Sequence, residues 1–124
     1  MGRGRGQTVL LVEDAPDLGP LLRETLEEWG YSALLGRSVA EAWACSRRTR
    51  CRLVLLDQEL PDMSGTERVE RLRSEQRAVP PVVLVTAGPR PGEGTRWPEV
   101  VELLRKPFEL AELAALLERH LVRR

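Results

Sequence analysis

The chain has 124 residues, 42% of them hydrophobic and 31% charged, which is the size and composition of one ordinary globular domain. Its 19 basic and 19 acidic residues balance, so the charge gives no sign of a surface for nucleic acid or an anionic membrane. The two cysteines, Cys45 and Cys51, lack metal-ligand spacing, and no signal peptide or membrane span is visible, so we expect a cytoplasmic protein in a reducing compartment.

The N-terminal third predicts a strand and a helix after a short tail. Residues 1–7 are rich in glycine and arginine, and we expect a disordered tail before one domain over residues 8–124. The apolar run TVLLV that follows the tail predicts a strand. Apolar residues at helical spacing then predict a helix over residues 18–29, which Asp17 would cap and Gly30 would end.

The middle of the chain repeats this alternation. Residues 31–35 predict a second short strand. Ser38 and Glu41 have the spacing of a capping box, which predicts the start of a second helix. The run LVLL at residues 53–56 ends abruptly at Asp57. A run without polar positions is typical of a strand buried on both faces of a parallel sheet.

The C-terminal half predicts a loop, a helix, two strands and a last helix. A second capping box, at Ser64 and Glu67, marks the helix after the loop. Residues 82–85 and 100–104 predict the strands. Residues 88–98 between them are dense in glycine and proline, so the fourth helix should be short or irregular. The last helix is expected to pack through one apolar face formed by Leu110, Leu113, Ala114, Leu117 and Leu121.

Five strands that alternate with helices indicate an α/β fold with a parallel sheet and right-handed crossovers. In such open sheets the functional site lies at the carboxyl ends of the strands, so the residues directly after each apolar run are the candidates. These candidates are Glu13, Asp14, Asp57, Thr86 and Lys106.

The candidate residues suit metal-assisted phosphoryl transfer. Three clustered carboxylates repel one another, and a hard divalent cation with oxygen ligands, such as Mg²⁺, relieves that repulsion. A cation beside Asp57 would neutralise an incoming phosphoryl group, and a carboxylate can act as the nucleophile that forms an acyl phosphate. Lys106 and Thr86 could then contact the transferred oxygens.

In this order, four motifs resemble those of the receiver domain of two-component response regulators: LLVEDAPDL, VLLDQELPDMSG, VVLVTA and LLRKPF. The resemblance covers residues 8–121. It implies a doubly wound, flavodoxin-like (βα)5 fold of three layers with strand order 2-1-3-4-5. It also implies a single-domain switch that is not an enzyme and promotes only its own phosphorylation and dephosphorylation.

The resemblance assigns metal ligands. Asp14 and Asp57 are expected to bind Mg²⁺ (or Mn²⁺) directly, Glu13 to act on the metal through water, and the backbone carbonyl of Glu59 to complete the protein ligands.

The resemblance also assigns the phosphoryl chemistry. Asp57 is the expected phosphoacceptor, Thr86 the hydroxyl that moves to the phosphoryl group, and Lys106 the cation that bridges it, with Pro107 holding the backbone, often through a cis peptide bond. The donor would be a histidine kinase or a phosphotransfer protein. The output partner is not identifiable, and neither direct nucleic-acid binding nor membrane binding is expected.

The chain departs from the family pattern in two places. Leu103 stands where the family usually has an aromatic residue that reports phosphorylation, and the stretch from Thr86 to Lys106 is short. We therefore expect no dimer through residues 88–104, and a partner at the first-helix region or the remodelled loop instead. Glu59 and Gly88 are expected to tune the phosphoryl lifetime.

Three alternatives remain at this point. One is a phosphorylation-independent interaction module with the same fold, which Leu103 motivates. A phosphatase is a second, because Asp57-Gln58-Glu59 is a distant match to the D-x-D motif. The third, a nucleotide- or flavin-binding fold, is disfavoured because acids follow the first strand, where a phosphate site needs glycine and backbone N–H groups.

His120, the only histidine, is expected to be a solvent residue at the end of the last helix. Met1 and the terminal helix favour a stand-alone chain.

Overall fold

The computed structural model describes residues 7–46, 49–58, 70, 74, 80–87 and 100–121. The predicted helix after Ser64, the segment 88–98, Glu59 and Gly88 lie outside these residues. The five strands are β1 (Thr8–Val12), β2 (Ser32–Gly36), β3 (Leu53–Asp57), β4 (Val82–Thr86) and β5 (Val100–Arg105). The helices are α1 (Leu18–Glu28), α2 (Val39–Ser46) and α4 (Leu110–His120). The predicted strands and these three helices are confirmed to within about two residues at each end.

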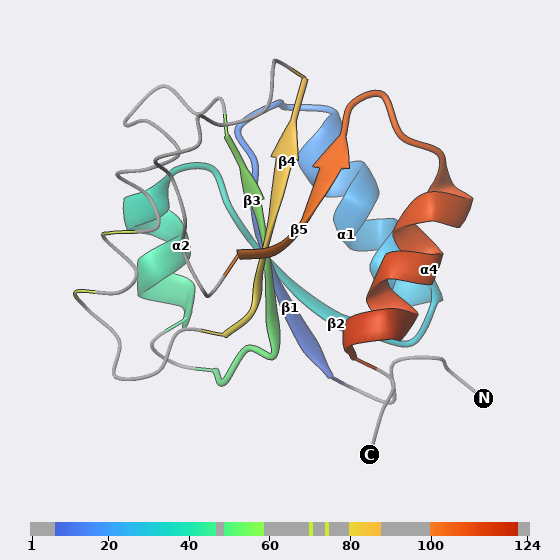
Figure 1. Cartoon of the computed structure of the whole chain (residues 1–124). Helices are drawn as coiled ribbons and strands as arrows, with labels where there is room; N and C mark the ends of the chain where they lie inside the picture. The colour runs from blue at the N-terminus through green and yellow to red at the C-terminus, as the bar shows by residue number, and fades with distance from the viewer. Residues whose placement is uncertain are drawn as a thin grey trace.

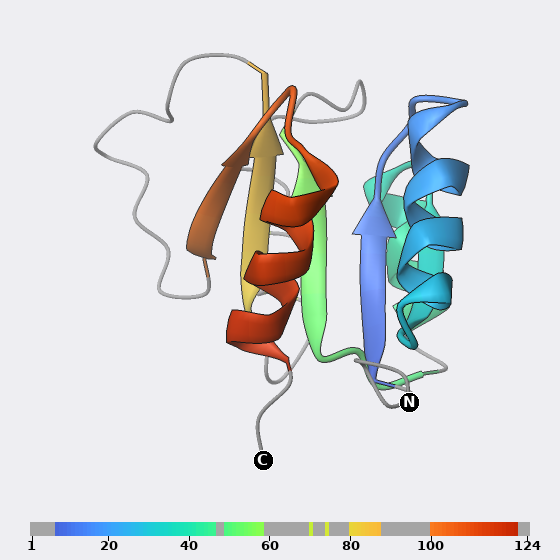
Figure 2. The same ribbon diagram turned by 90° about the vertical axis from the view of Figure 1, so that its right-hand side faces the viewer.

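The strands form one parallel sheet in the order β2-β1-β3-β4-β5, which confirms the expected fold class. Figure 1 shows α2 on one face of the sheet and α1 with α4 on the other. The view in Figure 2 shows α1 and α4 side by side over the same face. Because β1 and β3 are adjacent and parallel, both strands end at the same edge of the sheet.

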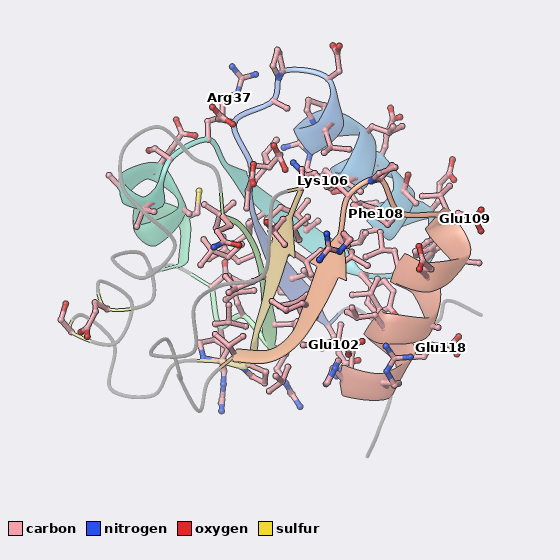
Figure 3. All side chains as sticks on the ribbon, turned by 45° about the horizontal axis from the view of Figure 1, so that its top comes forward. Arg37, Glu102, Lys106, Phe108, Glu109 and Glu118 are labelled. Carbon is pink, nitrogen blue, oxygen red and sulfur yellow. The ribbon has the colours of Figure 1, made fainter. Side chains whose placement is uncertain are left out.

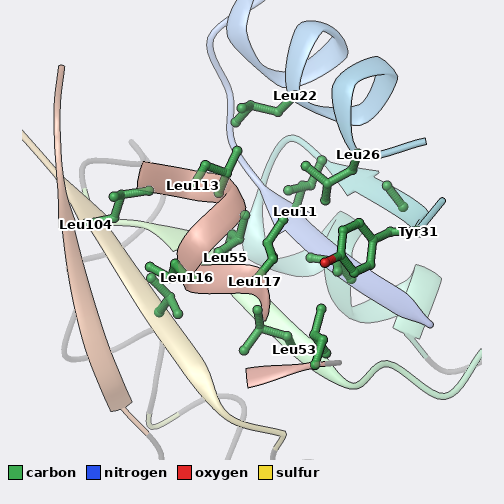
Figure 4. Packing of buried hydrophobic residues seen from close by; sticks show 14 of the residues in the cluster. Leu11, Leu22, Leu26, Tyr31, Leu53, Leu55, Leu104, Leu113, Leu116 and Leu117 are labelled. Carbon is green, nitrogen blue, oxygen red and sulfur yellow. The ribbon is translucent and has the colours of Figure 1, made fainter. Parts of the chain in front are cut away.

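The core consists of two apolar clusters, one on each face of the sheet. Every residue of β1, β3 and β4 is buried, and successive side chains alternate between the clusters. The larger cluster lies under α1 and α4, where Leu26, Leu113 and Leu117 are fully buried (Figure 4). Burial of each such leucine contributes about 2 kcal/mol, so this packing fixes the strands whose ends carry the candidate site.

β5 contains a bulge at Val101. Val100 pairs with Val82, but the next residue of β4, Val83, pairs with Glu102. The extra residue, Val101, is 44% exposed. Because a bulge shifts the alternation of side chains by one position, Val100 packs against the α2-side cluster and Glu102 is free to face α4.

Glu102 joins β5 to the last turn of α4. Its carboxylate accepts a hydrogen bond from Arg119, and its Oε1 lies 2.8 Å from Nε2 of His120. The prediction that His120 is a solvent residue is therefore wrong: its side chain is 22% exposed and bonded to the strand. Hydrophobic periodicity could not find this contact, since it joins polar residues far apart in sequence.

The helix ends differ from the sequence predictions in two cases. Asp17 occupies the N-cap of α1 but makes no side-chain capping hydrogen bond, because its backbone is already helical (φ −95°, ψ −39°). At α2 the hydroxyl of Ser38 accepts a hydrogen bond from the Glu41 N–H at 3.1 Å, as predicted. The Glu41 carboxylate accepts from the N–H of Arg37 instead of Ser38. Gly30 ends α1 with φ 95°, which a side chain would disfavour.

The terminal segments of the domain are tied to the sheet. The carbonyl of Gln7, directly before β1, accepts a hydrogen bond from the Ser32 N–H at 2.9 Å.

The buried face of the last helix differs from the prediction at one residue. It comprises Leu113, Leu116, Leu117 and Leu121, whereas Leu110, predicted on that face, is 50% exposed. None of the helices in the described ranges is long and apolar enough to cross a membrane.

Candidate functional site

The carboxyl ends of β1, β3, β4 and β5 carry the candidate site. Glu13 and Asp14 follow β1, Asp57 ends β3, Thr86 ends β4, and Lys106 follows β5. The parallel register sets Asp57 beside Val85 and Thr86 beside Arg105, and the N–H of Lys106 donates to the carbonyl of Thr86 at 2.8 Å. Figure 3 shows Lys106 at this edge of the sheet.

Three carboxylates gather there. One carboxylate oxygen from each of Glu13, Asp14 and Asp57 lies within 4.8 Å of the others. Glu13 is 4% and Asp57 3% exposed, while Asp14 is the most accessible of the three. Buried carboxylates so close repel each other strongly, and the cluster needs a proton or a cation to be stable.

The surroundings of Glu13 raise the pKa of its carboxyl group. Burial, a hydrogen bond with Asp57 and the charge of Asp57 together raise the pKa of Glu13 from 4.5 to about 7. The N–H of Ala15, which donates to Glu13 Oε2 at 3.2 Å, and the charge of Lys106 lower this pKa but do not prevent the rise. In the absence of a metal, Glu13 therefore titrates near neutral pH instead of near pH 4.5.

Lys106 brings a positive charge next to two of these carboxylates. Its Nζ lies 3.4 Å from Glu13 Oε1 and 3.5 Å from Asp57 Oδ2, so one ammonium group faces two carboxylates. The side chain is 22% exposed and reaches the site from the solvent side. The bond between Lys106 and Pro107 is cis, as the resemblance implied.

Two other residues singled out from the sequence lie on β4 and β5. Thr86 is 2% exposed and ends the strand next to β3. Leu103, at the position where the family usually has an aromatic residue, is partly buried against the apolar core cluster on the α2 side of the sheet. Glu59 and Gly88 are not among the described residues.

The donor set fits a divalent cation. Three carboxylates offer hard oxygen ligands within a few ångströms of one another, which suits Mg²⁺ or Mn²⁺, and no sulfur or imidazole group competes among these residues. The pKa of Glu13 is raised chiefly by burial and then by the hydrogen bond and charge of Asp57, so a nearby cation would favour its charged form.

Sequence periodicity missed an apolar groove beside this cluster. It has a volume of about 620 Å³ and lies between α1 and the start of α4. Leu21, one of the apolar residues at helical spacing in α1, is 55% exposed there. Helical spacing identifies which side of a helix is apolar, but not whether another element covers all of it.

The fold is a doubly wound parallel α/β sheet, and three carboxylates and a lysine meet at the carboxyl ends of its strands. The family model for the response regulator receiver domain matches residues 9–118. The chain therefore belongs to the response regulator receiver domain family of two-component systems.

Similar proteins agree with this assignment. The chain is 40% identical over 89 residues to the probable transcriptional regulatory protein TcrX of Mycobacterium tuberculosis, covering 70% of this chain and 38% of TcrX. It is 31% identical to the phosphate regulon transcriptional regulatory protein PhoB of Pseudomonas aeruginosa, covering 91% of this chain and 51% of PhoB.

Among solved structures, the non-phosphorylated HemR receiver domain from Leptospira biflexa superposes with a TM-score of 0.81 at 32% identity. That match covers 95% of this chain and 96% of the HemR domain. Against TcrX and PhoB, by contrast, the chain spans about half or less of the relative's length.

Proposed function

We propose that this receiver domain accepts a phosphoryl group on Asp57 in a Mg²⁺-dependent reaction and that this changes its affinity for a partner. The observation that supports the proposal is the meeting of the carboxylates of Glu13, Asp14 and Asp57, with the ammonium group of Lys106 next to Glu13 and Asp57. A purely structural domain gains nothing from a buried cluster of like charges, whereas a phosphoryl acceptor requires one nucleophilic carboxylate with nearby cations.

Each residue has a part in this transfer. Asp57 is the nucleophile: a carboxylate oxygen forms the new O–P bond while the P–N bond to the donor histidine of a kinase or phosphotransfer protein breaks. Glu13, Asp14, Asp57 and the backbone carbonyl of Glu59 would hold Mg²⁺. The cation, when bound, supplies charge neutralisation to the phosphoryl oxygens.

Lys106 and Thr86 would respond to the new charge. Phosphorylation would place negative oxygens next to Lys106, whose ammonium group faces Glu13 and Asp57 in the unphosphorylated structure. An ammonium group that exchanges a carboxylate partner for a phosphoryl partner, and a hydroxyl that donates to the same group, are differential contacts of the kind that bias a two-state switch. We infer that the protein works in the cytoplasm, where ATP-dependent kinases would supply the donor.

Intact-mass measurement after incubation with acetyl phosphate and Mg²⁺ tests the proposal. We expect the wild type to gain one phosphoryl group and Asp57→Asn to gain none. Asp17→Asn, which removes an exposed aspartate at the N-cap of α1, is the matched control and should be labelled like the wild type. An unlabelled wild type that still binds Mg²⁺ would refute phosphoacceptance and leave the phosphorylation-independent interaction module.

A further inference from the structure

Gln58, the residue after the expected phosphoacceptor, lies beside Thr86. β3 and β4 pair in register up to Asp57 and Val85. The N–H of Gln58 donates to the carbonyl of Val85 at 2.9 Å, which continues this parallel ladder by one residue and sets Gln58 next to Thr86. Because paired residues of adjacent strands project from the same face of a sheet, the amide of Gln58 and the hydroxyl of Thr86 come from neighbouring positions on one face.

That face is the α2 side of the sheet. Leu56 and Leu84, two residues before Gln58 and Thr86, both belong to the apolar core cluster on this side. Thr86 is 2% exposed, and Gln58 is half-buried. A hydrogen bond between the two side chains would therefore form largely away from bulk water, where such a bond is electrostatically stronger.

The side-chain oxygen of Gln58 is an unsatisfied acceptor. Within the described part of the chain, this Oε1 atom is buried and accepts no hydrogen bond. Buried polar atoms are nearly always paired, so an exception calls for an explanation. Since no donor holds the oxygen in place, the amide can turn an N–H group toward Thr86 without breaking a hydrogen bond at the oxygen.

The hydroxyl of Thr86 can use such a donor. A hydroxyl donates one hydrogen bond and accepts others at the same time. In the proposed function, Thr86 donates to the phosphoryl group on Asp57, and its oxygen can then accept from a neighbouring N–H. The end of β3 places the Gln58 amide, with two N–H groups, at that position.

We propose that Gln58 is a positioning residue of the switch, which donates an amide N–H to Oγ1 of Thr86 and thereby directs this hydroxyl toward the phosphoryl group. The hydrogen bonds from amide to hydroxyl and from hydroxyl to phosphoryl oxygen run in one direction, so each polarises the next. Gln58 itself does not touch the reacting atoms. The inference rests on the proposed phosphoacceptance at Asp57 and adds a residue to it.

Isothermal titration calorimetry with beryllofluoride, a phosphoryl mimic, in the presence of Mg²⁺ tests the proposal. Gln58→Met keeps the length of the side chain but removes its donors, and we expect it to weaken binding about three- to tenfold, as for one lost hydrogen bond. Gln7→Met makes the same change at a half-buried position before β1, at the opposite edge of the sheet, and should leave the affinity unchanged.

Thr86→Val separates positioning from packing, because it removes the hydroxyl and keeps the volume. If Gln58 acts through that hydroxyl, Gln58→Met should cause little further loss of beryllofluoride affinity in the Thr86→Val background. An unchanged affinity of Gln58→Met alone would overturn the proposal. So would a loss of equal size in both backgrounds, because Gln58 would then act independently of Thr86.

Unfolding in urea without metal checks the state of the amide oxygen. Because Oε1 of Gln58 has no partner to lose, Gln58→Met should not lower the urea midpoint, and a lower midpoint would contradict the proposal. A wild type that binds Mg²⁺ but no beryllofluoride would refute phosphoacceptance and this inference together. A wild type and a Gln58→Met variant that bind beryllofluoride equally well would refute this inference alone.

Discussion

Nζ of Lys106 lies 3.5 Å from Oδ2 of Asp57, across the ends of two strands that are not neighbours in the sheet. β4 separates β3 from β5, so the lysine reaches over the end of β4 to meet the carboxylate. The same ammonium group faces Glu13 at 3.4 Å. One cation thus holds together the ends of three strands, and its removal has consequences for both stability and chemistry.

Lys106→Met should destabilise the protein in the absence of Mg²⁺. The substitution leaves Glu13 and Asp57 buried without their cation, and a buried carboxylate that loses its partner costs about 1–3 kcal/mol. Urea unfolding at pH 8 with a chelator would measure the loss. Arg23→Met, at an exposed position on α1, is the control and should change the unfolding free energy by less than about 0.5 kcal/mol. Equal losses in the two variants would contradict the role given to the Lys106 ion pairs.

Mg²⁺ should stabilise the wild type and lose this effect when Asp57 becomes asparagine. A ligand that binds only the folded state at 100 times its dissociation constant adds about 2.7 kcal/mol. Asp57→Asn removes one of the three carboxylates, so the metal-free variant should be more stable than the metal-free wild type, and added Mg²⁺ should matter less. Thermal unfolding with Mg²⁺ and with a chelator measures both effects. A Mg²⁺ shift of the same size in Asp57→Asn would rule out Asp57 as a ligand.

The strand-end rule predicted the place of the candidate site from sequence. Apolar runs without polar positions mark buried parallel strands, and a polar residue directly after such a run must lie at the sheet edge. Glu13, Asp14 and Asp57 meet there because β1 and β3 are adjacent and parallel. The assignment of individual roles, such as phosphoacceptor and metal ligand, came from the family resemblance and not from spacing.

Some contacts and exposures could not be predicted from sequence, because they depend on strand register and on how the elements pack. The contact of Glu102 with His120 requires the bulge at Val101, and a shift of one residue in β5 would turn Glu102 to the other face. Leu21 is 55% exposed although it shares the helical spacing of buried neighbours, and the helical period does not say which apolar residues another element covers. Asp17 has a capping residue type but a helical backbone, so propensity alone misassigned its role.

The link between β5 and α4 should depend on pH through Glu102. Burial raises the pKa of Glu102, but hydrogen bonds from His120 and Arg119 and their charges outweigh it, so the pKa is lowered. A carboxylate whose pKa is lower in the folded state adds stability above its unfolded pKa, and that stability is lost as the pH falls through the folded value.

Glu102→Gln should therefore cost about 0.5–1 kcal/mol at pH 7, as for a solvent-screened ion pair. The gap to the wild type should close below about pH 4, where Glu102 becomes protonated in the wild type as well. Urea unfolding across this pH range measures the gap, with Glu27→Gln as an exposed control on α1. A gap that is the same at pH 7 and pH 3 would mean that the charge of Glu102 adds no stability.

Two glycines offer a sharp test of the packing on either face of β2. A Cβ added at Gly36 would lie 2.5 Å from both the backbone nitrogen and the Cα of Ala42, so α2 would have to move away from the sheet. A Cβ at Gly19 would meet the flexible end of Leu35 at 3.0 Å, and alanine there also favours the helix by about 1 kcal/mol. We expect Gly36→Ala to destabilise the fold by about 3 kcal/mol or more and Gly19→Ala to be nearly neutral. Chemical denaturation compares the two, and a neutral Gly36→Ala would show that α2 does not pack on β2 as closely as described.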